Sequence, residues 1–127
     1  MNSISAEKQS AIQDIFSRKK AVIGVIHCLP FPGAPKYRGE SIKNIIDRAL
    51  NDAENYLEGG IHGLIIENHG DIPFSKPEDI GPETSALMAV ITDNIRRRFA
   101  VPLGINVLAN AAIPALAIAL ASGAAFV

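Results

Sequence analysis

Several features that identify common protein classes are missing from this 127-residue chain. It has a single cysteine, Cys28, so it forms no internal disulfide, and we expect a protein of the reducing cytoplasm. Its 12 basic and 13 acidic residues give a net charge of -1 and form no basic stripe with interleaved aromatics, which argues against a nucleic-acid partner. The opening residues MNSISAEKQS lack an apolar core, so we expect no secretory signal.

Common enzyme motifs are missing too. The sequence contains no GxGxxG, P-loop, GxSxG or CxxC pattern, which removes the commonest nucleotide-binding and hydrolase hypotheses. The length suits one domain with one hydrophobic core.

Residues 100–127 contain no charged side chain, and this stretch is longer than the roughly 20 apolar residues of a membrane helix. Prolines, a glycine and asparagines interrupt it, at Pro102, Gly104, Asn106, Asn110 and Pro114. A strand, a turn, an alanine-rich buried helix and another strand account for it better than a membrane span, so we expect no transmembrane segment.

Apolar runs that end in a polar residue and a loop recur along the chain. Residues 21–26 end at His27, residues 61–66 end at Glu67, and a third run from Pro102 reaches Asn106. Uncharged runs rich in β-branched residues are typical of strands in a parallel sheet. Helical spacing of apolar residues predicts helices between them, the first after the N-cap residue Ser41 and the second from Pro82.

Alternating strands and helices indicate parallel βαβ units with right-handed crossovers. A flavodoxin-like open sheet and a (β/α)8 barrel both begin this way. A barrel needs about 250 residues, and residues 124–127 read as the opening of a fourth strand, so we predict the N-terminal half of a (β/α)8 TIM barrel with parallel strands. Residues 1–20 are expected to form an N-terminal capping helix, and residues 21–127 the half barrel.

The polar residues at the strand ends are the strongest functional signal. Parallel strands bring His27, Glu67 and Asn106 to the carboxyl end of the sheet, where α/β folds bind ligands. His27 is either a structural histidine bonded to a loop carbonyl or a general base. A carboxylate that closes an apolar strand costs several kcal/mol unless it is paired, which favours a site role for Glu67.

The neighbouring loops add further candidates. We predict His27 and Glu67 as catalytic, with a set of substrate-binding residues made up of Asn68, Asp71, Asn106 and Asn110. Cys28 faces away from His27 if strand alternation holds, so the two do not form a nucleophile pair. Glu67, His69 and Asp71 could hold a divalent metal, but their spacing matches no specific motif, so we assign no metal and no cofactor.

Specific motifs relate the chain to a known family. They are His-x-Leu-Pro-x-Pro-Gly within residues 22–39 and Glu-Asn-x-x-Asp-x-Pro-Phe within residues 59–74, joined by GPETSALM (81–88) and PLGINVLAN (102–110). Together they resemble the BtpA/SgcQ family over most of residues 21–127. The resemblance implies a ribulose-phosphate-binding-like barrel, whose chain continues past the position of Val127 for about as long again.

One stretch departs from the family pattern. Where the family usually has Asn-Val-Leu-Arg-Asn-Asp, this chain has alanine at positions 109 and 111, so an activity that depends on the arginine and aspartate would be lost.

The resemblance implies two functions of different kinds. One is a small-molecule enzyme of sugar or nucleoside (phosphate) metabolism, such as a nucleosidase, with His27 or Glu67 as general base and Asn106 on a substrate hydroxyl or carbonyl. The other is a non-catalytic assembly factor for a membrane complex such as photosystem I, with peripheral membrane association. The convergent polar cluster favours the enzyme, and the missing arginine and aspartate favour the assembly factor.

The apolar edge at residues 124–127 and the inner face of a half barrel would be exposed in a lone chain, which invites association. We therefore predict a homo-oligomer, most simply a homodimer. Light scattering coupled to size exclusion should give twice the mass of the chain, with a cooperative thermal melt of the same sample. A monodisperse monomer that melts cooperatively would contradict this prediction.

Overall fold

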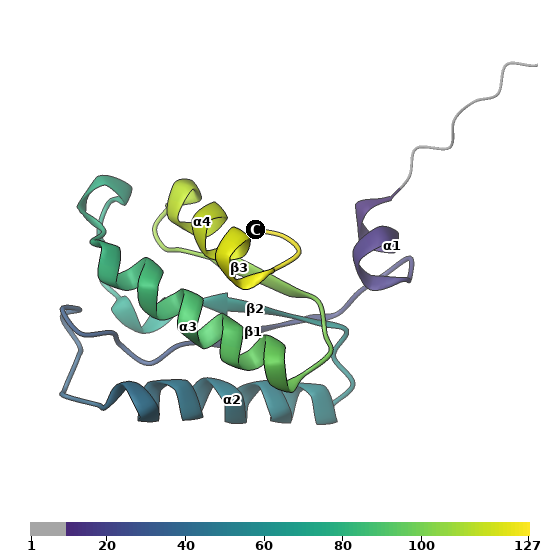
Figure 1. Cartoon of the computed structure of the whole chain (residues 1–127), viewed down its shortest axis with the longest axis horizontal. Coiled ribbons are helices and arrows are strands. Elements are labelled where there is room, and N and C mark those ends of the chain that lie inside the picture. Colours follow the sequence, from purple (N-terminus) through teal and green to yellow (C-terminus); the bar gives the residue numbers. More distant parts are fainter. Residues whose placement is uncertain (1–9) are drawn as a thin grey trace, which may run out of the picture.

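A computed structural model describes residues 10–127 (Figure 1). Three strands alternate with three long helices, as the apolar periodicity predicts, and a short helix precedes them. In chain order the elements are α1 (Ala11–Phe16), β1 (Ile23–His27), α2 (Ile42–Glu58), β2 (Gly63–Glu67), the 3-10 turns η1 (His69–Asp71) and η2 (Pro77–Asp79), α3 (Pro82–Arg98), β3 (Leu103–Asn106) and α4 (Ala112–Ser122).

The strands form one parallel sheet in the order β1-β2-β3. A flavodoxin-like sheet places its first strand between the second and third, whereas here β2 lies between its two neighbours, so that alternative is wrong. The register pairs His27 with Glu67 and Glu67 with Asn106, so these three residues form a row across the carboxyl end of the sheet. The α/β class with parallel strands is confirmed.

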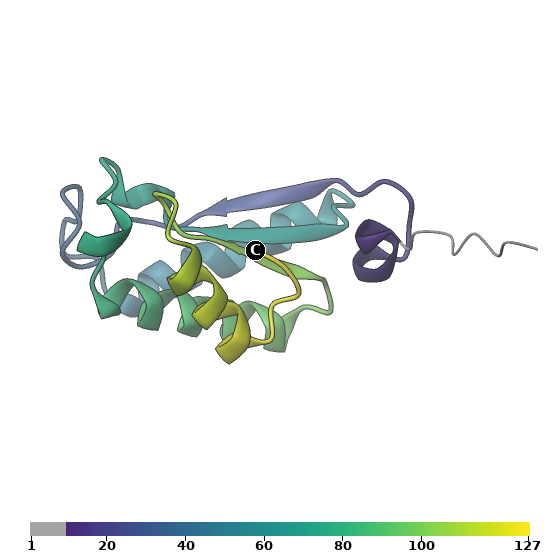
Figure 2. The same ribbon diagram turned by 90° about the horizontal axis from the view of Figure 1, so that it is seen from above.

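The long helices cover one face of the sheet (Figure 2). On that face Ile26, Ile66 and Ile105 are almost completely buried and belong to the hydrophobic core. The alternate strand positions lie on the other face, where His27 and Asn106 are exposed. Sequential strand order with helices on one side is consistent with part of a barrel.

The helix ends follow the residues that the sequence provides for them. Ser41 caps α2 by accepting a hydrogen bond from the Asn44 backbone N–H at 3.1 Å, as predicted. Pro82 stands in the first turn of α3, where its missing N–H costs no helical hydrogen bond. Gly123 ends α4 in the left-handed conformation, with φ of 74°.

At the amino end of the sheet, α1 contributes the ring of Phe16. This ring packs edge-on against Phe126 with centroids 5.6 Å apart, and it lies so close to Gly63 that a Cβ there would come within 2.4 Å of it. The start of the predicted capping helix, in residues 1–9, lies outside the described residues.

The uncharged stretch divides into β3, a loop and the 11-residue helix α4. Phe126 then makes a parallel bridge to Gly104, and its carbonyl accepts the Ile105 N–H at 3.1 Å, where the sequence predicts a fourth strand to open. Within residues 10–127, no helix is long and apolar enough to cross a membrane. The outer side of α4 leaves Ile113 and Leu120 more than four-fifths exposed.

The loops after β1 and β2 are joined by a close backbone approach at Gly70. The Gly70 N–H donates to the Cys28 carbonyl at 3.1 Å, and a Cβ on Gly70 would lie 2.5 Å from that oxygen and from the Pro30 nitrogen. The obstructing atoms are backbone, so they move only if the whole loop moves.

We therefore predict that Gly70→Ala lowers the free energy of unfolding by about 1–3 kcal/mol, the usual cost of overpacking a tight site. Chemical denaturation followed by circular dichroism measures the change. Gly59→Ala is the matched control, because Gly59 has helical φ of -76° and a Cβ there would meet its nearest atom at 3.3 Å. Equal stability of the two variants would contradict the prediction.

Candidate functional site

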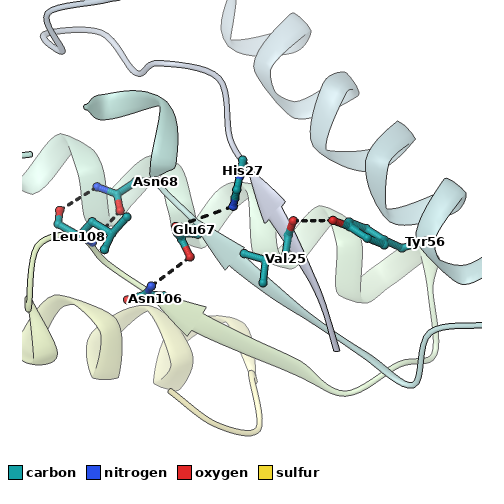
Figure 3. A network of polar contacts seen from close by, with 7 residues as sticks. All are labelled: Val25, His27, Tyr56, Glu67, Asn68, Asn106 and Leu108. Atoms are coloured by element: carbon teal, nitrogen blue, oxygen red, sulfur yellow. Dashed lines mark hydrogen bonds and ion pairs between the residues drawn. The ribbon is translucent and has the colours of Figure 1, made fainter. Parts of the chain in front are cut away.

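Three polar side chains from three adjacent strands meet at the carboxyl end of the sheet (Figure 3). His27, Glu67 and Asn106 are the last residues of β1, β2 and β3, and the parallel register places them side by side. The structure thus brings together both predicted catalytic residues and one predicted substrate-binding residue.

Glu67 lies at the centre of this row. Its side chain is only 13% exposed, and the Asn106 side-chain amide donates to Glu67 Oε2 at 3.0 Å. The other carboxylate oxygen, Oε1, faces His27 Nε2 at 4.0 Å, which is longer than a hydrogen bond. One oxygen is therefore held in place by a hydrogen bond, while the second faces His27 without one.

His69 joins this row from the loop after β2. It begins η1, two residues beyond Glu67, and its ring stacks on His27 with centroids 4.2 Å apart and planes 12° from parallel. The ring of Phe74 packs edge-on against the His69 ring, with centroids 5.9 Å apart. Ligand atoms of His27, Glu67 and His69 all lie within 4.8 Å of one another, so these residues could hold a metal.

The metal-ligand set that the sequence suggests differs from this cluster in one member. Asp71 accepts the Phe31 backbone N–H at 2.9 Å and the Asn68 side-chain amide at 3.4 Å, which ties it to the neighbouring loops. Burial raises the pKa of the Asp71 carboxyl, and the hydrogen bonds from Phe31 and Asn68 oppose that rise. In the structure, His27 lies beside Glu67 and His69, and Asp71 does not belong to this cluster.

Asn68 connects the loops after β2 and β3. It is 2% exposed; its carbonyl oxygen accepts the Leu108 backbone N–H at 2.7 Å, and its amide donates to the Leu108 carbonyl at 3.1 Å (Figure 3). Asn68 and Asp71 line a separate polar cavity of about 130 Å³ between the loops and the start of α3. Their part in substrate binding stays a prediction.

Asn110 lies in the loop after β3, away from the Glu67 row. It is exposed and has a positive φ of 55°, a conformation that asparagine adopts more readily than most residues. It lines an open hollow with Asn106, bordered by Ile105 and Ala115. Its predicted role in substrate binding also stays a prediction.

Comparison with known proteins places the chain in a family. The sequence model described as the BtpA family matches residues 18–127. The chain belongs to the BtpA family. The family match includes the whole sheet, the three long helices and all of the candidate site residues.

Curated relatives of this family carry divergent names. The chain is 45% identical over 108 residues to an uncharacterized protein of Pyrococcus horikoshii, covering 85% of this chain and 40% of that one. It is 39% identical over 112 residues to the photosystem I biogenesis protein BtpA of Synechocystis, covering 88% and 38%. It is 29% identical over 119 residues to the putative sgc region protein SgcQ of Escherichia coli, covering 93% and 43%.

The chain therefore spans about two fifths of the length of these relatives. No solved structure matches it.

Cys28 follows His27 but lies on the other side of the strand end. It is buried in the core, and burial, with a smaller effect of the Asp71 charge, raises the pKa of its thiol to about 12. A thiol is nucleophilic only as the thiolate, so Cys28 is not the nucleophile of this site.

We predict that iodoacetamide at pH 8 alkylates Cys28 at least about 100-fold more slowly in the folded chain than in urea, as mass spectrometry will measure. Equal rates would contradict its burial.

The unfolded thiol ionises near pH 9 and the folded one near pH 12, so the folded state binds this proton more tightly. The free energy of unfolding should consequently fall as the pH rises through that window.

Proposed function

We propose that this chain forms one part of a (β/α)8 barrel. The sequential parallel order, the helices on a single face and the parallel bridge of Phe126 to β3 support this proposal. In such a barrel the face that carries Glu67 would point inward, and the row of strand-end residues would lie at the end where barrel enzymes bind substrate.

Within that barrel, the chain acts as a small-molecule enzyme of sugar or nucleoside (phosphate) metabolism. The observation that carries this proposal is the carboxylate of Glu67, which is nearly buried, held at one oxygen by Asn106 and open at the other. A nearly buried carboxylate is costly for stability unless it is paired, and its fixed orientation suits proton transfer.

The neighbouring side chains complete this assignment. Glu67 is the general base, and His27, which is 55% exposed, is the group through which its proton can reach solvent. The Asn106 side-chain N–H positions the carboxylate. The amide oxygen of Asn106 accepts a hydrogen bond from a substrate hydroxyl. Asn68 and Asp71 hold the surrounding loops, and Asn110 contacts the distal part of a larger substrate.

A non-catalytic assembly factor is the second candidate. The Synechocystis relative is named for photosystem I biogenesis. In addition, this chain has Ala109 and Ala111 at the two positions where the family pattern described above has an arginine and an aspartate. The exposed apolar side of α4, with Ile113 and Leu120, offers a surface for a partner protein.

We predict that Glu67→Gln lowers turnover by about 100-fold or more, because the amide cannot accept the proton while its shape is retained. The chain is incubated with a panel of nucleosides, pentose phosphates and hexose phosphates, and consumption is followed by NMR. Asp47→Asn is the matched control, since Asp47 is an exposed partner of Lys43 on α2 and lies outside the site.

Two results would overturn the enzyme proposal. One is a Glu67→Gln chain that turns over the same compound as fast as the unaltered chain. The other is that Glu67→Ala and His27→Ala chains, shown by circular dichroism to be folded, support the cellular function as well as the unaltered chain does. The second result would favour the assembly factor.

A further inference from the structure

The three potential metal ligands come from two paired strand ends and the turn that follows one of them. The β1–β2 register fixes the backbone of His27 opposite that of Glu67, and only Asn68 separates Glu67 from His69. The backbone N–H of Gly70 on the Cys28 carbonyl holds this turn against the β1 loop. The backbones that carry all three ligands are therefore tied together.

The donor atoms of these side chains are available. Glu67 uses Oε2 for the bond from Asn106 and keeps Oε1 directed at His27, 4.0 Å away. The contacts of the His27 and His69 rings are mainly a mutual stacking and, for His69, the edge of Phe74. Neither kind of contact occupies an imidazole lone pair, which is what a metal requires.

The donor atoms lie close to bonding distance, and the imidazole rings must also turn. In a tetrahedral zinc site, ligand atoms about 2.0–2.1 Å from the ion lie roughly 3.4 Å from one another. The present atoms lie within 4.8 Å, so each must move by about 1 Å or less, and the imidazole planes must tilt out of their stack so that both lone pairs meet. The His27 side chain is more than half exposed, so apart from its stack on His69 much of its ring faces solvent.

The donor types indicate the class of ion. Two imidazoles and one carboxylate suit Zn²⁺ and its neighbours Co²⁺ and Ni²⁺, whereas Ca²⁺ and Mg²⁺ prefer shells of oxygen ligands. Three protein ligands leave a position open for water or for a substrate oxygen. Asn106 behaves as an outer-shell residue, because its bond to Oε2 orients the carboxylate that would bind through Oε1.

We propose that His27, Glu67 and His69 bind a divalent transition-metal ion of the Zn²⁺ class at the carboxyl end of the sheet. The site shares Glu67 and His27 with the proposed active site and rests on that function only for its use: with Oε1 on the ion, a water molecule acidified by the ion would take the place of the carboxylate as the base beside the substrate. Binding of the ion itself is independent of any reaction.

The test is titration of the EDTA-treated and dialysed chain with Co²⁺, followed by visible absorption. We expect saturable ligand-field bands at a single Co²⁺ per chain, lost on addition of Zn²⁺, and a rise in melting temperature with either ion. His27→Ala, His69→Ala and Glu67→Gln should each weaken binding by more than about 100-fold, and Asn106→Ala by about 10-fold.

His62→Ala is the matched control, because His62 is the remaining histidine and accepts the Val22 backbone N–H before β2 begins, at the other end of the sheet. Circular dichroism establishes that each variant is folded, and His69→Asn replaces His69→Ala if the latter is not. Absence of saturable Co²⁺ binding overturns the proposal. So does binding that survives loss of His69, or binding that His62→Ala weakens as much as His69→Ala does.

Activity separates this inference from the proposed function. If the unaltered chain binds no Co²⁺ but Glu67→Gln abolishes turnover of a nucleoside or sugar phosphate, the ion site is wrong and the enzyme proposal stands. If His69→Ala loses Co²⁺ binding while Glu67→Gln turns over a compound as fast as the unaltered chain does, the ion site stands and the enzyme proposal fails.

Discussion

The pairing of β1 with β2 is the constraint on which the rest of the site depends. Parallel pairing in this register aligns Ile26 with Ile66 beneath the helices, and in the same step aligns His27 with Glu67 on the uncovered face. A shift of one residue would bury the carboxylate and expose the isoleucines, because side chains alternate along a strand. The hydrophobic core therefore fixes the position of the polar row.

Much of this arrangement could be predicted from local sequence patterns. Apolar runs, the N-cap at Ser41 and the proline at the start of α3 locate the elements, because each depends on residues close in the chain. The meeting of His27, Glu67 and Asn106 follows from parallel pairing alone. The order of the strands in the sheet, and the packing of the helices on one face, could not be predicted from these patterns. The flavodoxin-like and barrel alternatives share the same order of elements along the chain.

The position of His69 could not be derived from spacing. Its ring reaches His27 because η1 turns the chain back over the end of β1, and that turn depends on Gly70 contacting Cys28 and on Asp71 contacting Phe31. These contacts join residues about 40 positions apart. The same contacts explain why Asp71, a plausible ligand by sequence proximity, is instead used to hold the loop.

The loops around the site hold one another in place. The first is tied to the second through Gly70 and Asp71, and the second to the third through the two bonds between Asn68 and Leu108. Lengthening any of these segments would therefore disturb its neighbours. Within the first loop, residues 35–40 carry local bonds, such as the one from the Tyr37 hydroxyl to the Glu40 carbonyl, and an inserted segment could be accommodated there without altering the site.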